Sequence, residues 1–327
     1  TNRCGSERAI PRCEPERATP AGAVVVTSTV LDATLALLLI SAAVATVLPT
    51  APADADGQMS GSARPERTLE TLSTSTTEVN YTLAPGAARA DETPIRFERQ
   101  RGPEFRRTAH GTYAGLLARS ALSTLDVDGE AVTRTGTDFR ASVRAATLET
   151  LTASPPGHRR SAEVQVVAAW RPYPAAPVQS RLRVGPTPPP EATVRAASLT
   201  VPSGYPSTRE RAVDAAERGG FAGIARVVAA GIVGGTFPPG TASFALHGDY
   251  PVAALVADRY YRFGALLGVD VREPIAEGDA RGANEALTAA LAPRIERDLR
   301  ASYERPAAAA RAVRMDRVRI AVRTWSA

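Results

Sequence analysis

The topology of this chain is decided by the stretch VVVTSTVLDATLALLLISAAVATVL, residues 24–48. A single charge, Asp32, interrupts it, and the part from Ala33 to Leu48 carries none. A bilayer core about 30 Å thick requires roughly 20 apolar residues in a helix, and residues 29–48 supply that length. We therefore expect residues 26–49 to form a transmembrane helix.

Two other interpretations of this apolar run stay open. A cleaved signal peptide has a shorter apolar centre, of about 7–15 residues, followed by small residues at the cleavage site. Ala43-Val44-Ala45 resembles such a site, and cleavage there would give a secreted protein. The third interpretation is a buried core helix. The length of the run favours the membrane anchor.

The charges on either side of the run predict its orientation. Cytoplasmic flanks are enriched in arginine and lysine. Four arginines precede the run: Arg3, Arg8, Arg12 and Arg17. Asp54 and Asp56 follow it, and the next arginine is Arg64. We expect a single-pass protein of the cell membrane, with its N-terminus in the cytoplasm and its C-terminal region outside.

The first 25 residues show no apolar periodicity and contain both cysteines, Cys4 and Cys13. They are interpreted either as a disordered tail or as an over-extended gene start, with translation beginning near Val26. Eight residues separate the two cysteines and no histidine is nearby, so their spacing is not that of a zinc or redox motif.

All 39 basic residues are arginine, and the net charge is +5. The absence of lysine excludes a P-loop lysine, a Schiff-base lysine and Ser-Lys catalysis. A nucleic-acid surface requires a basic stripe with stacking aromatics, and only residues 96–107, with Phe97 and Phe105 among arginines, approach this pattern. We expect no nucleic acid as a partner. The arginines are expected on a solvated face or against anionic lipid heads or surface glycans.

Beyond the span, a flexible linker is expected over residues 50–66 and an extracytoplasmic α+β region over 67–327, with a possible subdivision near residue 202. Alternation of apolar and polar residues predicts strands, at residues 76–84, 162–170, 180–184, 192–201 and 314–325. Apolar residues at helical spacing predict helices, at residues 110–125, 139–153, 207–230, 250–267 and 279–303. Elements of one kind follow one another in runs, which favours an α+β fold over α/β.

Local signals refine this pattern. Asp138 is predicted to cap the helix at 139–153, and Ser207 with Glu210 forms a capping-box pattern. Residues 221–237 are apolar, but they are short for a span and are broken by glycines, so we expect a core helix there. The last strand has valine and isoleucine on one face and arginine on the other. This pattern is typical of a sheet with one face in water.

Candidate sites are few. Asn80-Tyr81-Thr82 is an N-glycosylation sequon in an outward position of a predicted strand, so Asn80 is a glycosylation candidate. The three histidines have no partner at helical spacing, and no G-x-S-x-G elbow occurs. DVDGE, residues 126–130, resembles the start of a calcium loop but lacks later acidic ligands, so a turn is expected. We assign no catalytic, cofactor-binding or metal residues, and predict that the protein is not an enzyme.

The stretches TSTVLDATLALLLISAAVATVL (residues 27–48) and VRIAVRTW (residues 318–325) resemble an uncharacterised family of haloarchaeal single-span membrane proteins. The resemblance implies a link to type IV pilus-like (Tad-like) secretion systems. In type IV pilins an acidic residue five places into the mature helix helps the subunit to dock, and counted from Ser28 this residue is Asp32.

Asp32 is therefore the assembly candidate, because an ionisable group within a span is costly and points to function. The leading hypothesis is a non-enzymatic structural or accessory protein, pilin-like, with the lipid bilayer and other single-span subunits as partners. The alternative is a membrane-anchored hydrolase or binding protein of the cell envelope.

Overall fold

The computed structural model describes residues 64–88, 94–132, 135–153 and 163–326. The chain divides into two units, residues 1–58 and 59–327. The predicted tail and transmembrane helix, Asp32 and almost all of the predicted linker lie outside the described residues.

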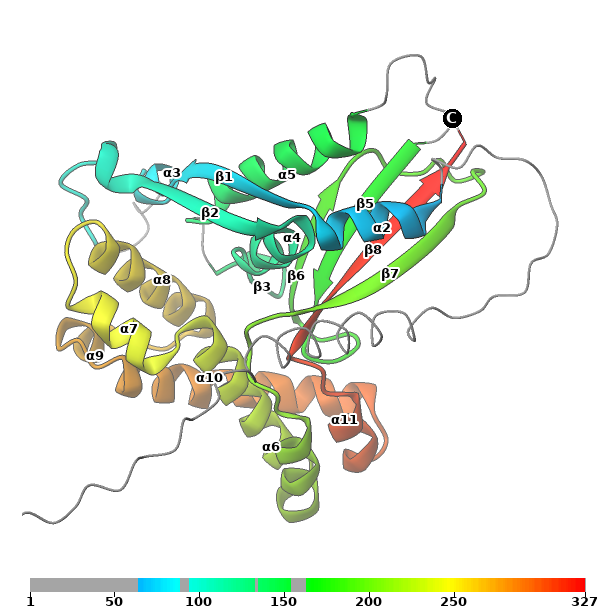
Figure 1. Cartoon of the computed structure of the whole chain (residues 1–327). Helices are drawn as coiled ribbons and strands as arrows, with labels where there is room; N and C mark the ends of the chain where they lie inside the picture. The colour runs from blue at the N-terminus through cyan, green and yellow to red at the C-terminus, as the bar shows by residue number, and fades with distance from the viewer. Residues whose placement is uncertain (1–63, 89–93, 133–134, 154–162, 327) are drawn as a thin grey trace, which may run out of the picture. The chain divides into compact units, whose positions relative to one another are not determined.

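The described part of the second unit is a mixed α+β structure, as predicted (Figure 1). Its helices are α2 (Pro65–Thr74), α3 (Ala84–Ala87), the 3-10 turn η1 (Pro103–Phe105), α4 (Tyr113–Leu122), α5 (Thr137–Thr152), α6 (Arg209–Thr236), α7 (Pro239–Leu246), α8 (Val252–Leu267), α9 (Arg272–Ala276), α10 (Ala280–Ser302) and α11 (Pro306–Ala312). Its strands are β1 (Thr76–Thr82), β2 (Arg106–Thr112), β3 (Asp126–Val127), β4 (Glu130–Ala131), β5 (Glu163–Trp170), β6 (Val178–Val184), β7 (Arg195–Pro202) and β8 (Arg317–Trp325).

Two antiparallel sheets contain these strands. One is the pair β1–β2, and the other has six strands in the order β4-β3-β6-β5-β8-β7. The C-terminal strand β8 therefore lies between β5 and β7 in the sheet. In the chain, the six helices α6 to α11 separate β7 from β8. A central position suits β8, because every second side chain in it is valine or isoleucine with no exposed area, from Val318 through Ile320 to Val322.

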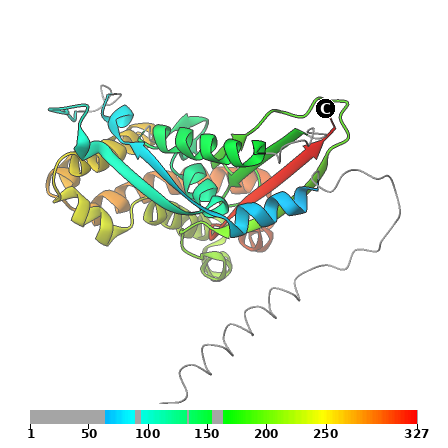
Figure 2. The same cartoon turned by 45° about the horizontal axis from the view of Figure 1, so that its top comes forward.

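One face of the large sheet forms part of the core. Helices α4 and α2 contact its strands on this side, and Figures 1 and 2 show them lying together beside β8. The inward side chains Val166, Ala168 and Leu182 are at most 1% exposed. Burial of aliphatic side chains at about 25 cal/mol per Å² is the main stabilising contribution of such a layer.

The predicted strands at 76–84, 162–170, 180–184, 192–201 and 314–325 all correspond to observed strands, with ends that differ by a few residues. The predicted helix at 110–125 is wrong at its start, because residues 106–112 form β2. Thr112 ends this strand and caps α4 by accepting a hydrogen bond from the Gly115 amide, at 3.1 Å. The predicted linker also ends earlier than expected, because α2 begins at Pro65.

Helices α6 and α10 form the centre of the helical half and pack along each other. In α6, Ile224, Val228 and Ile232 are fully buried at the four-residue spacing that places them on one helical face. Gly220 breaks the helix with a φ of 56° and a ψ of −142°, a conformation that favours glycine.

Among the described residues, α6 is the one helix whose length and composition would allow it to cross a membrane, a test that core helices also pass. The kink leaves residues 221–236 as the straight apolar part, shorter than the roughly 20 residues that a span requires. Together with the buried face, this agrees with the predicted core helix.

The predicted N-caps of α6 and α5 were wrong in detail, whereas the predicted start of α10 was correct. Thr208, not Ser207, precedes α6, and its hydroxyl donates to the Met315 sulfur. Asp138 lies in the first turn of α5, where its carboxylate accepts a hydrogen bond from the Thr82 amide at 2.7 Å. The predicted start of a helix at Asp279 is confirmed, since this carboxylate accepts hydrogen bonds from two amides of the first turn of α10.

Candidate anion-binding surface

The second face of the large sheet carries arginine side chains rather than a covering helix. In β6 the burial alternates, so that Arg181 and Arg183 are exposed while the residues between and beside them are buried. In β8 the same alternation exposes Arg319 and Arg323. Alternation follows from the two-residue period of a strand, which sends successive side chains to opposite faces.

The strand register brings these arginines together across β5. Ala169 pairs with Arg181 on one side and with Arg319 on the other. Val167 pairs with Arg183, and the next outward residue of β5, Gln165, pairs with Arg323. The outward residues of β5 therefore form a low strip between two rows of arginine.

We call this strip with its flanking arginines, Arg181, Arg183, Arg319 and Arg323, the arginine furrow. Since neighbouring strands are about 4.8 Å apart, the two rows lie roughly 9.6 Å apart across the furrow. Along each strand, residues two apart are separated by roughly 6.8 Å.

Within the part of the chain that the structure describes, none of the four furrow arginines forms an ion pair with a carboxylate. Their polar contacts are to neutral groups. Arg319 donates to the Ser198 hydroxyl at 3.3 Å, and Arg323 donates to the Gln165 side-chain carbonyl at 3.5 Å. Partial burial and then the charges of neighbouring arginines, Arg183 foremost, lower the pKa of Arg181. The furrow is therefore a positively charged surface whose four arginines form no ion pair among the described residues.

A cavity of about 310 Å³ lies at one end of the furrow. Arg181 and Arg319 line it together with Arg171 from the end of β5, Arg314 from the segment before β8, and Arg317 from the first residue of β8. The cavity is thus lined by arginines from β6 and β8, which flank β5 on either side, and from the chain segments that follow β5 and precede β8.

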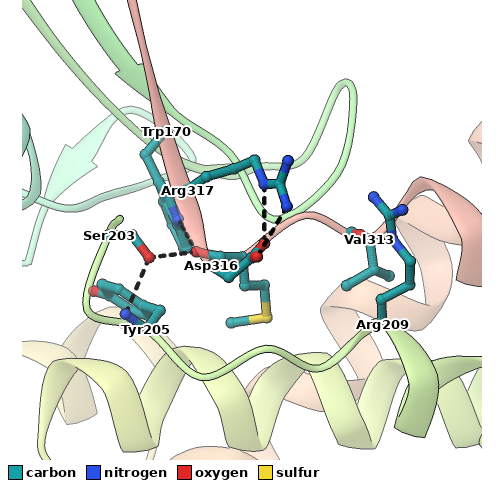
Figure 3. Close-up of polar contacts among 8 residues, drawn as sticks. Trp170, Ser203, Tyr205, Arg209, Val313, Asp316 and Arg317 are labelled. Atoms are coloured by element: carbon teal, nitrogen blue, oxygen red, sulfur yellow. Dashed lines mark hydrogen bonds and ion pairs between the residues drawn. The ribbon is translucent and has the colours of Figure 1, made fainter. Parts of the chain in front are cut away.

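The entry of β8 is held by hydrogen bonds beside this cavity (Figure 3). The Met315 carbonyl accepts from the Trp170 indole at 2.8 Å and from the Ser203 hydroxyl at 2.7 Å. Asp316 pairs with Arg317 at 3.1 Å, which orients the first arginine of the strand. Trp170 is 1% exposed and its ring lies 4.7 Å from that of Tyr205, so the floor of this region is rigidly packed.

The glycosylation candidate Asn80 lies on β1 with an exposed side chain, as its predicted outward register requires. Its side-chain carbonyl accepts a hydrogen bond from the Thr108 hydroxyl at 2.7 Å, across the β1–β2 pair. The amide nitrogen is the atom that a glycan would modify, and the Thr108 contact uses the oxygen only.

The histidines do not converge in the described structure. His110 is on the exposed side of β2, His247 follows α7 with its Nδ1 2.8 Å from the Ser243 carbonyl oxygen, and His158 lies outside the described residues. The DVDGE segment forms the β3–β4 hairpin, with Asp128 and Gly129 in left-handed conformations at its turn. The predicted turn is therefore confirmed, and the described residues contain no cluster of His, Cys, Asp or Glu that could hold a metal ion.

The aromatic residues of the basic stretch 96–107 are not available as a stacking platform. Phe105 is fully buried, and Phe97 packs against the ring of Tyr250 at a centroid distance of 6.3 Å. Arg99 lies over the same tyrosine ring and pairs with Glu104 at 3.5 Å. These contacts favour a structural role for the stretch.

A larger cavity, of about 700 Å³, lies between α6 and α10. Its carboxylates are Glu285 and Glu296 on α10. These two residues are eleven positions apart, about 16.5 Å along a helix. Paired carboxylates in glycosidases are separated by about 5–9.5 Å. The cavity therefore does not have the geometry of such an acid–base pair.

The fold and this surface define an α+β domain whose antiparallel sheet has one face in the core and an arginine-rich face in solvent. The chain belongs to DUF7284, a family of unknown function whose model matches residues 31–325. The match begins inside the apolar run and extends to the end of β8. Neither the curated proteins nor the solved structures contain a match to the chain.

The furrow was missed by the sequence-based prediction, although part of its signal was visible. The one-sided arginines of β8 were recognised, and the alternation SRLRV in β6 carries the same signal. The alternation in the sequence does not indicate that β6 and β8 both pair with β5. Asp32 stays a prediction, because it lies outside the described residues.

Proposed function

We propose that the protein is a non-enzymatic, membrane-anchored structural or accessory component of the cell envelope, and that its arginine furrow binds an acidic segment of a partner protein. The apolar run at residues 29–48 supports the anchor, with arginines before it and aspartates after it. The family match includes most of this run together with the sheet domain, which supports treating them as one functional protein.

The furrow is the observation that carries the binding role. An extended peptide repeats its side chains on one face at about 6.8 Å, which equals the spacing of Arg181 and Arg183 along β6. Alternate carboxylates in such a peptide would face successive guanidiniums, and arginine forms bidentate hydrogen bonds with carboxylate. The strip of β5 between the rows is low, because its central residues are Ala169 and Val167.

The binding role is tested with the full chain in detergent micelles and an immobilised peptide of alternating glutamate and serine. The furrow variant replaces Arg181, Arg183, Arg319 and Arg323 with glutamine. At about 0.5 kcal/mol per exposed pair, removing four pairs should weaken binding roughly 30-fold at low salt.

The matched control removes the same charge from the helical half, by replacing four of its exposed arginines, Arg211, Arg218, Arg297 and Arg311, with glutamine. This control should retain most of the affinity. Equal weakening in the two variants would mean that net charge alone attracts the peptide, and the furrow would then have no specific role.

The finer proposal is a pilin-like role in a type IV pilus-like assembly, with Asp32 as the docking residue. A carboxylate within a span is stabilised by a cationic group of a neighbouring subunit. We expect Asp32→Ala to reduce co-purification with other single-span subunits, while Asp54→Ala, beyond the span, should leave it unchanged. Unchanged assembly of Asp32→Ala would refute the docking role.

We also propose that Asn80 carries a glycan when the domain is outside the cell. Mass spectrometry of the protein from its native host should show an added mass on the peptide that contains Asn80. The added mass should disappear in Asn80→Gln, and a peptide of unmodified mass in the native protein would refute the proposal.

A further inference from the structure

The cavity at the end of the furrow is distinguished by the charge of the residues that line it. Five arginines line it, and no carboxylate is among its described lining residues. Two acidic groups lie beside lining residues: Asp316, which is paired with Arg317, and Asp298, which neighbours Tyr173. At about 310 Å³ the cavity is at the lower end of the range of ligand pockets, roughly 300–1,000 Å³. It therefore suits a small anionic group rather than a large ligand.

The remaining wall is neutral. Trp170 and Tyr173 also line the cavity, and each is 1% exposed. Burial, followed by the neighbouring Asp298 carboxylate, raises the pKa of Tyr173, so this residue stays a neutral phenol and adds no negative charge to the site. Thr200 contributes a hydroxyl from β7. Apart from the guanidiniums, nothing charged lines the described wall.

The arginines come from several directions: Arg171 from the end of β5, Arg181 from β6, Arg314 from the segment before β8, and Arg317 and Arg319 from β8. A planar carboxylate has two oxygens and is satisfied by one or two guanidinium forks. A tetrahedral anion has oxygens in more directions and can use more of these donors. The repulsion among unpaired arginines, which already affects the pKa of Arg181, would be relieved when such an anion binds.

We propose that this cavity binds a single tetrahedral oxyanion, a phosphate or sulfate group, through Arg171, Arg314 and the neighbouring arginines of β6 and β8. This role goes beyond the binding of an acidic segment, because it concerns a small site with its own donors at one end of the furrow. The group can be a free ion, an ester on a larger molecule, or a lipid headgroup.

The test is thermal unfolding of the full chain in detergent micelles with increasing inorganic sulfate or phosphate, at constant ionic strength set with chloride. A specific site gives a saturable rise in Tm, of about 5–11 °C at a hundredfold excess over Kd. The site variant is Arg171→Gln with Arg314→Gln, both exposed residues that line the cavity but not the furrow. It should lose the saturable rise.

The matched control is Arg183→Gln with Arg323→Gln, which removes the same charge from the same sheet face outside the cavity. It should retain the sulfate response and lose affinity for the acidic peptide. Equal loss of the sulfate response in both variants, or a rise that is not saturable and is the same in all proteins, would overturn the proposed site. A wild-type protein that shows the saturable sulfate response but does not bind the peptide would refute the furrow's binding role alone, and one that binds the peptide without the sulfate response would refute the cavity site alone.

The source of the group is distinguished by transferring the protein into nanodiscs. A saturable sulfate response in discs of neutral lipid that disappears in discs of anionic phospholipid identifies a headgroup as the occupant. A response that is equal in both kinds of disc identifies a soluble anion or ester. Either result requires the Arg171 and Arg314 side chains, and a response that survives their replacement contradicts the site.

Discussion

Two neighbouring glycines of α6 are predicted to respond in opposite ways to the same substitution. At Gly234 an added methyl group meets no atom within 4 Å. At Gly235 it would fall on the ring of Tyr205, far inside van der Waals contact. Tyr205 is 9% exposed, packs against Trp170 and shares a hydrogen bond of 3.0 Å with Thr236. Gly235 therefore permits the close approach of the Tyr205 ring to α6.

The magnitudes follow from these surroundings. Gly234→Ala should stabilise the protein by about 1 kcal/mol, the difference in helix propensity. Gly235→Ala gains the same amount but displaces Tyr205, at about 1–3 kcal/mol for overpacking and about 0.5–1.5 kcal/mol for the disturbed aromatic pair. We expect a net loss of about 2 kcal/mol, and so a gap of about 3 kcal/mol between the two variants.

The assay is thermal unfolding of both variants and the wild type, followed by circular dichroism under identical conditions. At about 2–4 °C per kcal/mol for a domain of this size, the two variants should differ in Tm by about 6–12 °C. The reasoning is refuted if Gly235→Ala melts at or above the temperature of Gly234→Ala.

Three further predictions concern single side chains. Trp170→Phe removes the indole donor to Met315 and part of a buried ring, and should lower the free energy of unfolding by about 2–3 kcal/mol, measured in urea; an unchanged midpoint would contradict it. Asp138→Ala should cost about 1–3 kcal/mol because the Thr82 amide loses its acceptor, whereas Asp138→Asn should recover at least half, and equal losses in the two would exclude the hydrogen bond as the cause. Hydrogen bonds from the side chain and then the backbone amide of Arg272 lower the pKa of Asp270 to about 2 from 3.8, so this pair contributes stability above pH 3.8 that is lost as the pH falls toward 2. An NMR titration should show this midpoint, and Arg272→Gln should raise it only part of the way to the ordinary value, because the amide hydrogen bond remains; an unchanged midpoint would exclude the guanidinium as a cause.

Local patterns were sufficient to predict most elements of the sheet. The alternation in β5 and β8 and the turn at DVDGE were read correctly, because strand period and turn preference depend on neighbouring residues. The spacing of apolar residues likewise placed α8 and α10. The errors occurred where a distant group decided the outcome, as when the amide of Thr82 attracted the carboxylate of Asp138.

The sequence by itself determined the apolar run with its single charge, the absence of lysine, and strands whose arginines face one way. Only the tertiary structure decided that β8 is inserted between β5 and β7, and that its arginines face those of β6 across a low strip. The physical reason is that strand pairing joins segments that are more than a hundred residues apart, and its register depends on packing of the whole inner face. The arginine furrow and the cavity at its end are consequences of that register.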